Sequence, residues 1–115
     1  MAEFFVGLMS GTSLDGADAV LADFSGGAIS VLGHASTAFP ASLRAELLAL
    51  NTPGGSNELH RAALAGNALA RVYAAVTADL LNSTGVPAGS VTAIGAHGQT
   101  VRHRPLEFDG VGYTL

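Results

Sequence analysis

Two polar segments of the sequence carry residue types that could do chemistry, and each directly follows a short apolar run. The first reads SGTSLDGAD over residues 10–18, and the second reads HGQTVRHRP over residues 97–105. Glycines let backbone N–H groups approach a ligand closely, and hydroxyl groups add hydrogen-bond donors. The carboxylates of Asp15 and Asp18 are suited to a hydrated divalent cation. The first segment is therefore suited to a phosphate group and its counter-ion.

The first segment matches neither of the common nucleotide-binding fingerprints. It lacks the GxxxxGK[ST] pattern of P-loops and the GxGxxG pattern of dinucleotide-binding folds, and no lysine lies nearby. The string SGTSLDG is also a good hairpin turn, in which aspartate and serine side chains bond their own backbone. Composition alone leaves both interpretations open.

The second segment contains His97, Gln99, Thr100 and Arg102. One interpretation is a turn that ends a strand and bonds its own backbone. The other is a site that offers hydrogen bonds and a cation to a sugar bearing hydroxyls and a carboxylate, and we favour it. The six-residue spacing of His97 and His103, with no carboxylate between them, does not favour a metal site.

Hydrophobic patterning predicts the elements that position these segments. FFVGLM should be a strand buried on both faces, and VTAIGAHG should be another small, buried strand. Ser42 is the expected N-cap of the first helix, while His34 and His60 are expected to be ordinary surface or cap residues. The stripe with Tyr73 and Val76 is expected in the core. The expected elements are strands at 4–9, 17–24, 28–34 and 91–98, and helices at 42–50 and 57–82.

The order β-β-β-helix-β indicates an α/β fold in which three strands form an antiparallel meander. The fourth strand follows a helical crossover, so it should lie parallel to the first strand. The carboxyl ends of parallel strands meet at one edge of a sheet, where ligands of open α/β sheets bind. We therefore expect the two polar segments to face one cavity.

Composition limits the class of protein. The chain has 115 residues, 49% of them apolar and 12% charged, which suits one globular domain. Its net charge of -4 gives no basic footprint, so neither nucleic acid nor a membrane surface is expected as a partner. The first residues, MAEFFVGLM, show no signal peptide or membrane anchor, and a cytoplasmic location is the expectation.

The amino-acid sequences of both segments resemble those of one enzyme family. VGLMSGTSLDGADAVLADF together with GAHGQTVRHRP is similar to the anhydro-N-acetylmuramic acid kinases of bacterial cell-wall recycling. The resemblance implies a ribonuclease-H-like, actin-like kinase fold that uses ATP and Mg²⁺. It also implies a reaction in which water opens the 1,6-anhydro ring while the sugar O6 is phosphorylated, giving N-acetylmuramic acid 6-phosphate. By the same resemblance, the ATP phosphate segment consists of Gly11, Thr12, Ser13, Leu14, Asp15, Gly16, Ala17 and Asp18.

The resemblance leads to further expectations. Kinases of this family are much longer, so residues 1–115 are expected to be the N-terminal portion of the kinase domain, truncated at its C-terminal end and inactive alone. The catalytic base, the second phosphate loop and the adenosine pocket should lie outside it, and the longer enzyme is expected to form a homodimer. Met9 stands where many related sugar kinases have aspartate, so Asp15 or Asp18 should take over any metal role. The alternative is a non-catalytic ribonuclease-H-like fragment or interaction domain.

Overall fold

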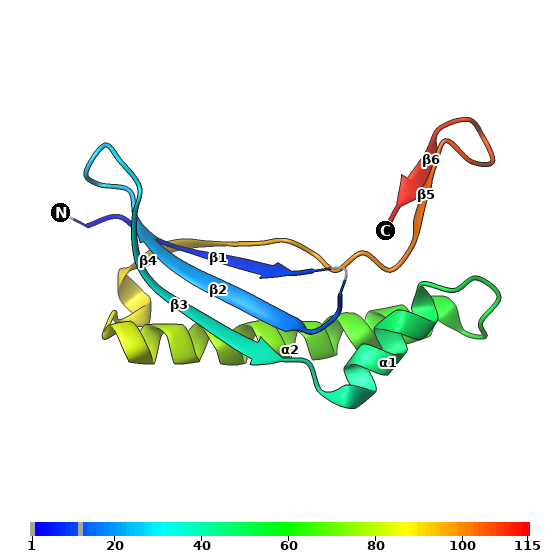
Figure 1. Cartoon of the computed structure of the whole chain (residues 1–115), viewed down its shortest axis with the longest axis horizontal. Helices are drawn as coiled ribbons and strands as arrows, with labels where there is room; N and C mark the ends of the chain where they lie inside the picture. The colour runs from blue at the N-terminus through cyan, green and yellow to red at the C-terminus, as the bar shows by residue number, and fades with distance from the viewer. Residues whose placement is uncertain (1, 12) are drawn as a thin grey trace.

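The computed structural model describes residues 2–11 and 13–115 and has a mixed α/β architecture (Figure 1). A four-stranded sheet lies against two helices, and a small two-stranded hairpin projects from one end. The strands are β1 (Phe4–Ser10), β2 (Gly16–Asp23), β3 (Ser30–Ala38), β4 (Val91–Ala96), β5 (His103–Pro105) and β6 (Gly112–Thr114). The helices are α1 (Ala41–Leu50), α2 (Glu58–Thr84) and the short 3₁₀ helix η1 (Ala88–Ser90).

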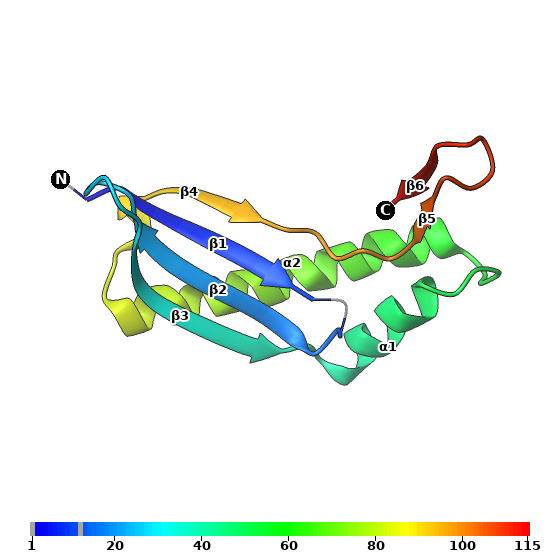
Figure 2. The ribbon, with the colours of Figure 1, turned by 45° about the horizontal axis from the view of Figure 1, so that its top comes forward.

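The main sheet has the order β3-β2-β1-β4. β1 and β2 pair antiparallel, as do β2 and β3, whereas β4 returns after α2 and pairs parallel to β1. Figure 2 shows α2 running along one face of this sheet, with α1 beside it at one end. The strand directions agree with those expected from the sequence, because a helical crossover carries the chain back to the end of the sheet where β1 begins.

The core lies between this face of the sheet and the helices. Strand side chains that point toward the helices alternate with exposed ones, so Val6 and Leu8 are buried while Gly7 and Met9 are exposed. The expectation that β1 is buried on both faces is therefore wrong, because the helices cover only one face of the sheet. The helices supply the other half of the core through Leu43, Leu47, Leu50, Ala65, Val72, Tyr73, Val76 and Leu80.

Strand β4 also differs from expectation. Its residues after Val91 are exposed, and Ile94 is 54% exposed, although the sequence predicted a buried strand. β4 is one of the two edge strands of the sheet, and it lies beyond the area that α2 covers. An apolar run shows that a segment can be buried, but position in the sheet decides whether it is.

The helices begin and end close to the predicted residues, with one local error. Helix α1 starts at Ala41, and the carbonyl of Pro40 accepts the first helical hydrogen bond from Arg44 N at 3.0 Å. Pro40 is therefore the N-cap residue, and Ser42 lies inside the helix without the predicted capping role. Within the described residues, neither helix is long and apolar enough to cross a membrane.

Candidate nucleotide and sugar site

The two polar segments meet at one edge of the sheet. The loop of residues 11–15 leaves β1, and the loop of residues 97–102 leaves β4, so the parallel pairing of these strands brings both loops to the same end. The pairing continues one step beyond β4, because His97 N donates to the Leu8 carbonyl at 2.9 Å. The expected juxtaposition of the two segments is therefore present.

A partly buried hydrogen-bond network joins the end of β1, helix α2 and the second loop. Ser10, which is 4% exposed, lies with its Oγ 2.7 Å from Gln99 Oε1 and 3.1 Å from the Tyr73 hydroxyl. The Tyr73 hydroxyl donates to the His97 carbonyl at 2.6 Å. The sequence correctly indicated that Tyr73 lies in the core. Its polar role was missed, because the helical stripe shows which face is buried but not what a hydroxyl reaches.

The first loop borders a cavity of about 440 Å³ on the β2 and β3 side. The loop and strand ends bring glycine backbone, hydroxyl groups and two carboxylates to its wall. Its lining consists of Gly11, Ser13, Asp15, Gly16, Ala17, Asp18, Ser36, Thr37 and Ala38. Six of the eight residues assigned to the phosphate segment therefore border one cavity. Thr12 lies outside the described residues.

Two features fix the backbone of this loop. Leu14 adopts a left-handed conformation with φ of 57°, and its side chain is buried in the core at 4% exposure. Leu14 N donates to the Gly11 carbonyl, and Phe39 N donates to the Asp15 carbonyl, each at 3.2 Å. An apolar anchor thus holds the middle of a polar loop, so Leu14 can reach a ligand in this cavity only through its backbone.

Gly16 is required by a close approach of two strands. A Cβ atom at this position would lie 2.2 Å from the Thr37 carbonyl oxygen and 3.0 Å from the Ala38 Cα. Any larger residue would push the end of β3 away from the start of β2. Gly16 therefore sets the width of the cavity where the loop joins the sheet.

The carboxylates of the cavity have different surroundings. Asp18 Oδ1 accepts a hydrogen bond of 2.5 Å from Ser36 Oγ and lies 3.5 Å from His34 Nε2. Asp15 is more exposed and lies 4.0 Å from an Arg44 guanidinium nitrogen. His34 is an exposed residue within β3, as expected of a surface residue, but its place beside Asp18 was missed, because the pairing of β2 with β3 creates it.

In proteins, Mg²⁺ is usually bound by one or two carboxylates and completes its coordination with water and phosphate oxygens. Asp15 and Asp18 both line the cavity and both remain exposed, so they fit such a partly hydrated ion. Across residues 2–11 and 13–115, no group of three or more His, Cys, Asp or Glu side chains forms a cage for a metal. The donor set therefore suits a cation delivered with a phosphate ligand.

The second loop borders another cavity, of about 360 Å³, formed by Leu14, Leu48, Asn51, Gln99, Thr100 and His103. Gln99 and Thr100 were predicted site residues, whereas Asn51 and His103 were not. Asn51 Nδ2 donates to the Leu47 carbonyl at 2.8 Å, and His103 Nδ1 lies 2.8 Å from Thr114 Oγ1. Leu14 lines this second cavity but not the first, so the loops meet but face two different cavities rather than one.

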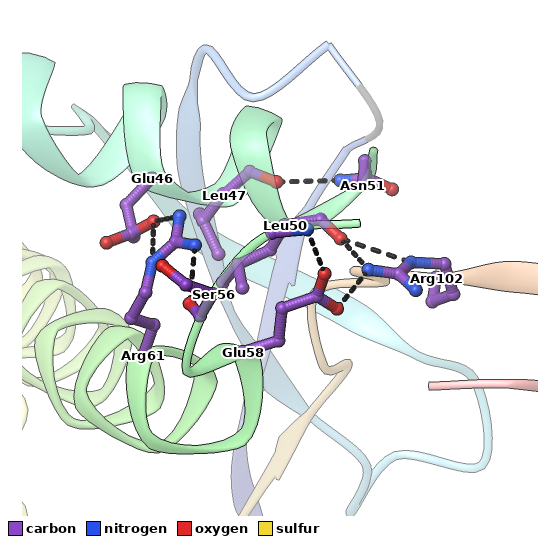
Figure 3. Close-up of polar contacts among 9 residues, drawn as sticks. Glu46, Leu47, Leu50, Asn51, Ser56, Glu58, Arg61 and Arg102 are labelled. Carbon is purple, nitrogen blue, oxygen red and sulfur yellow. Dashed lines mark hydrogen bonds and ion pairs between the residues drawn. The ribbon is translucent and has the colours of Figure 1, made fainter. Parts of the chain in front are cut away.

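His97 and Arg102, the other two predicted sugar-site residues, do not line this second cavity. Figure 3 shows the Arg102 guanidinium between the end of α1 and the start of α2. It donates to the Leu50 carbonyl at 2.8 and 3.2 Å and to Glu58 Oε2 at 2.7 Å. Arg102 therefore ties the second loop to the helices, and the structure does not bring its guanidinium together with Gln99 and Thr100.

The ion pairs at this junction perturb their carboxyl groups. The hydrogen bond from Arg102, followed by one from Gly55 N, lowers the pKa of Glu58 below its ordinary value. The Arg61 guanidinium pairs with Glu46 and lowers the pKa of that carboxyl in the same way (Figure 3). Charged hydrogen bonds thus fix α1, α2 and the second loop relative to one another.

Comparison with known proteins places this arrangement in a family. The family model described as anhydro-N-acetylmuramic acid kinase matches residues 3–115. A curated protein of that name from Variovorax paradoxus is 70% identical over 98% of this chain, and one from Albidiferax ferrireducens is 60% identical over the whole chain. The chain spans about 30% of the length of these relatives. The extent of the match and the high identities show that this chain belongs to the anhydro-N-acetylmuramic acid kinase family.

Proposed function

We propose that this chain supplies the phosphate-binding loop and part of the sugar site of an ATP-dependent anhydro-N-acetylmuramic acid kinase. The complete enzyme would use water to open the 1,6-anhydro ring and would transfer the γ-phosphoryl group of ATP to O6. The product is N-acetylmuramic acid 6-phosphate, an intermediate of cell-wall recycling in the cytoplasm. The observation that carries this proposal is the glycine, hydroxyl and carboxylate lining of the cavity at the β1–β2 loop, in a chain of this family.

In this proposal, the segment Gly11–Asp18 binds the phosphates of ATP. Gly11 leaves room for oxygens to approach the backbone, and the Ser13 hydroxyl can donate to them. ATP would bring Mg²⁺, which offsets phosphate charge, and Asp15 and Asp18 would hold its water ligands. Asp18 is held by Ser36 through one oxygen, which leaves its second oxygen available. These contacts would hold the phosphates and the ion in place.

The sugar would occupy the second cavity, against Gln99 and Thr100. Asn51 and His103 add polar groups to the same wall, while Leu14 and Leu48 add apolar surface. A mixture of apolar contacts and a few placed polar groups is typical of small-molecule sites. His97 and Arg102 would support the sugar site indirectly. The His97 carbonyl accepts from Tyr73, and the Arg102 guanidinium holds the second loop against Leu50 and Glu58.

The topology supports a ribonuclease-H-like, actin-like assignment. Three antiparallel strands followed by a helical crossover to a parallel strand form the order β3-β2-β1-β4, with the proposed phosphate loop at the β1–β2 turn. In such kinases, ATP and sugar lie between two lobes, and we propose that this chain belongs to one of them. A homodimer of the longer enzyme is part of the same proposal and rests on the family resemblance.

A chimera tests the proposed function. This chain would replace the segment that it matches in the V. paradoxus relative, and phosphorylated sugar would be measured by mass spectrometry with ATP, Mg²⁺ and anhydro-N-acetylmuramic acid. We expect turnover, and we expect Asp15→Asn and Asp18→Asn to lower Mg²⁺-dependent kcat/KM by about tenfold or more, as for a lost charge-assisted contact.

Asp79→Asn is the matched control, because it makes the same charge change on an exposed position of α2 outside both cavities. It should leave kcat/KM within about twofold of the unsubstituted chimera, since exposed substitutions away from such features have small effects. A folded chimera without turnover would reject the function. Equal activity of all three variants would reject the assignment of the loop.

A further inference from the structure

We propose that Tyr73 is a positioning residue that sets the second loop against the phosphate loop through its hydroxyl group. The proposal rests on the proposed function for its consequences in catalysis, but its structural basis is independent of that function. Tyr73 lies in the middle of α2, far along the chain from both loops. Its side chain is only 9% exposed, and its hydroxyl contacts a residue at the end of β1 and a residue just after β4.

The allocation of protons gives Tyr73 and Ser10 different roles. The His97 carbonyl can only accept, so the single hydroxyl proton of Tyr73 is committed to it at 2.6 Å. The Ser10 proton is directed at Gln99 Oε1 at 2.7 Å and also faces the Tyr73 oxygen at 3.1 Å. Removing the Tyr73 hydroxyl therefore leaves Ser10 with a partner and removes the side-chain donor from the His97 carbonyl.

Removal of the Tyr73 hydroxyl should affect the second loop. The backbone of His97 is held at its N–H, which donates to the Leu8 carbonyl, and at its C=O, which accepts from the Tyr73 hydroxyl. Gln99 and Thr100 follow within three residues and line the second cavity. A change in the His97 peptide would displace these side chains, whereas β1 and the phosphate loop retain their strand pairing and the Leu14 anchor.

Tyr73→Phe is the direct test, because it removes one oxygen and keeps the ring in the core. Val76→Ala is the matched control, because Val76 lies one helical turn away, is fully buried and has no polar group. In the 115-residue chain without ligands, hydrogen exchange followed by mass spectrometry would be measured for both variants. We expect Tyr73→Phe to speed exchange of amides in 97–101 by about threefold to tenfold, as for one lost hydrogen bond. Val76→Ala should instead speed exchange in α2 and lower the melting temperature.

Kinetics of the chimera give the second readout. We expect Tyr73→Phe to raise KM for the anhydro sugar by about threefold to tenfold and to leave KM for ATP within about twofold. In a double-mutant cycle with Gln99→Ala, Tyr73→Phe should cost less than about twofold once Gln99 is gone, since its effect acts through that side chain. Val76→Ala should combine additively with Gln99→Ala.

The outcomes separate this inference from the proposed function. An inactive chimera with the expected exchange pattern would reject the kinase function and retain the positioning role. An active chimera in which Tyr73→Phe and Val76→Ala give the same exchange pattern and the same KM values would overturn the positioning role. A Tyr73→Phe effect on KM for ATP as large as that for the sugar would also overturn it, because the substitution would then act on both loops alike.

Discussion

Replacement of Gly16 by alanine is the sharpest steric test of the site. A Cβ atom at this position would lie 2.2 Å from the Thr37 carbonyl oxygen, whereas ordinary contacts begin at 3.4 Å. The end of β3 must therefore move away from β2 by about 1 Å, and such overpacking costs about 1–3 kcal/mol. The register partner of Gly16 is Ala38, so this movement opens the cavity at the base of the loop.

The expected result has two parts. Urea unfolding of the chain, followed by circular dichroism, should show a loss of about 1–3 kcal/mol in the free energy of unfolding for Gly16→Ala. In the chimera, kcat should fall by about 100-fold, because a misplacement of about 1 Å in a reacting geometry can have that effect. The loss of activity should exceed what the loss of stability explains at a temperature where the protein remains folded.

Gly7→Ala is the matched control on the neighbouring strand β1. A Cβ atom there would meet nothing within 4 Å, so this variant should be as stable as the unsubstituted chain or more so. A Gly16→Ala variant that matches Gly7→Ala in both stability and kcat would refute the steric reasoning. Lost stability with unchanged kcat would refute only the assignment of the cavity to phosphate.

Two further predictions concern what holds the site in place. The pKa of Glu58 is lowered in the folded chain, so its pairing stabilises the fold above the ordinary carboxyl pKa, and this contribution is lost as the pH falls through the folded pKa. Glu58→Gln should therefore lower the melting temperature at pH 7 and lower it less at pH 3. An equal difference at both pH values would contradict this reasoning. Leu80→Ala, at a position with 0% exposure, should lower the free energy of unfolding in urea by about 2–5 kcal/mol. Leu59→Ala in the same helix, at 89% exposure, should change it by no more than about 0.5 kcal/mol. Similar values for the two variants would refute the assigned core face of α2.

The sequence by itself determined the order of β1 to β4 with α1 and α2 and the location of the two loops, whereas the hairpin of β5 and β6 was not predicted. Apolar runs bounded by glycine and polar clusters marked β1, β2 and β4, and the helical spacing of Tyr73, Val76 and Leu80 marked the buried face of α2. The crossover through α2 then required β4 to run parallel to β1, which brought the loops together. These features could be predicted because they depend on local periodicity and on the handedness of the chain.

Only the tertiary structure decided how the site is divided and held. The two loops border different cavities, and Asn51, at the end of α1, lines the second one together with His103 of β5. Arg102 turns toward Leu50 and Glu58, and Tyr73 reaches His97, because residues distant in sequence become neighbours when the helices pack on the sheet. A side chain of given type can form many different hydrogen bonds, and packing selects among them, so the sequence identified the polar loops but not the contacts that fix them.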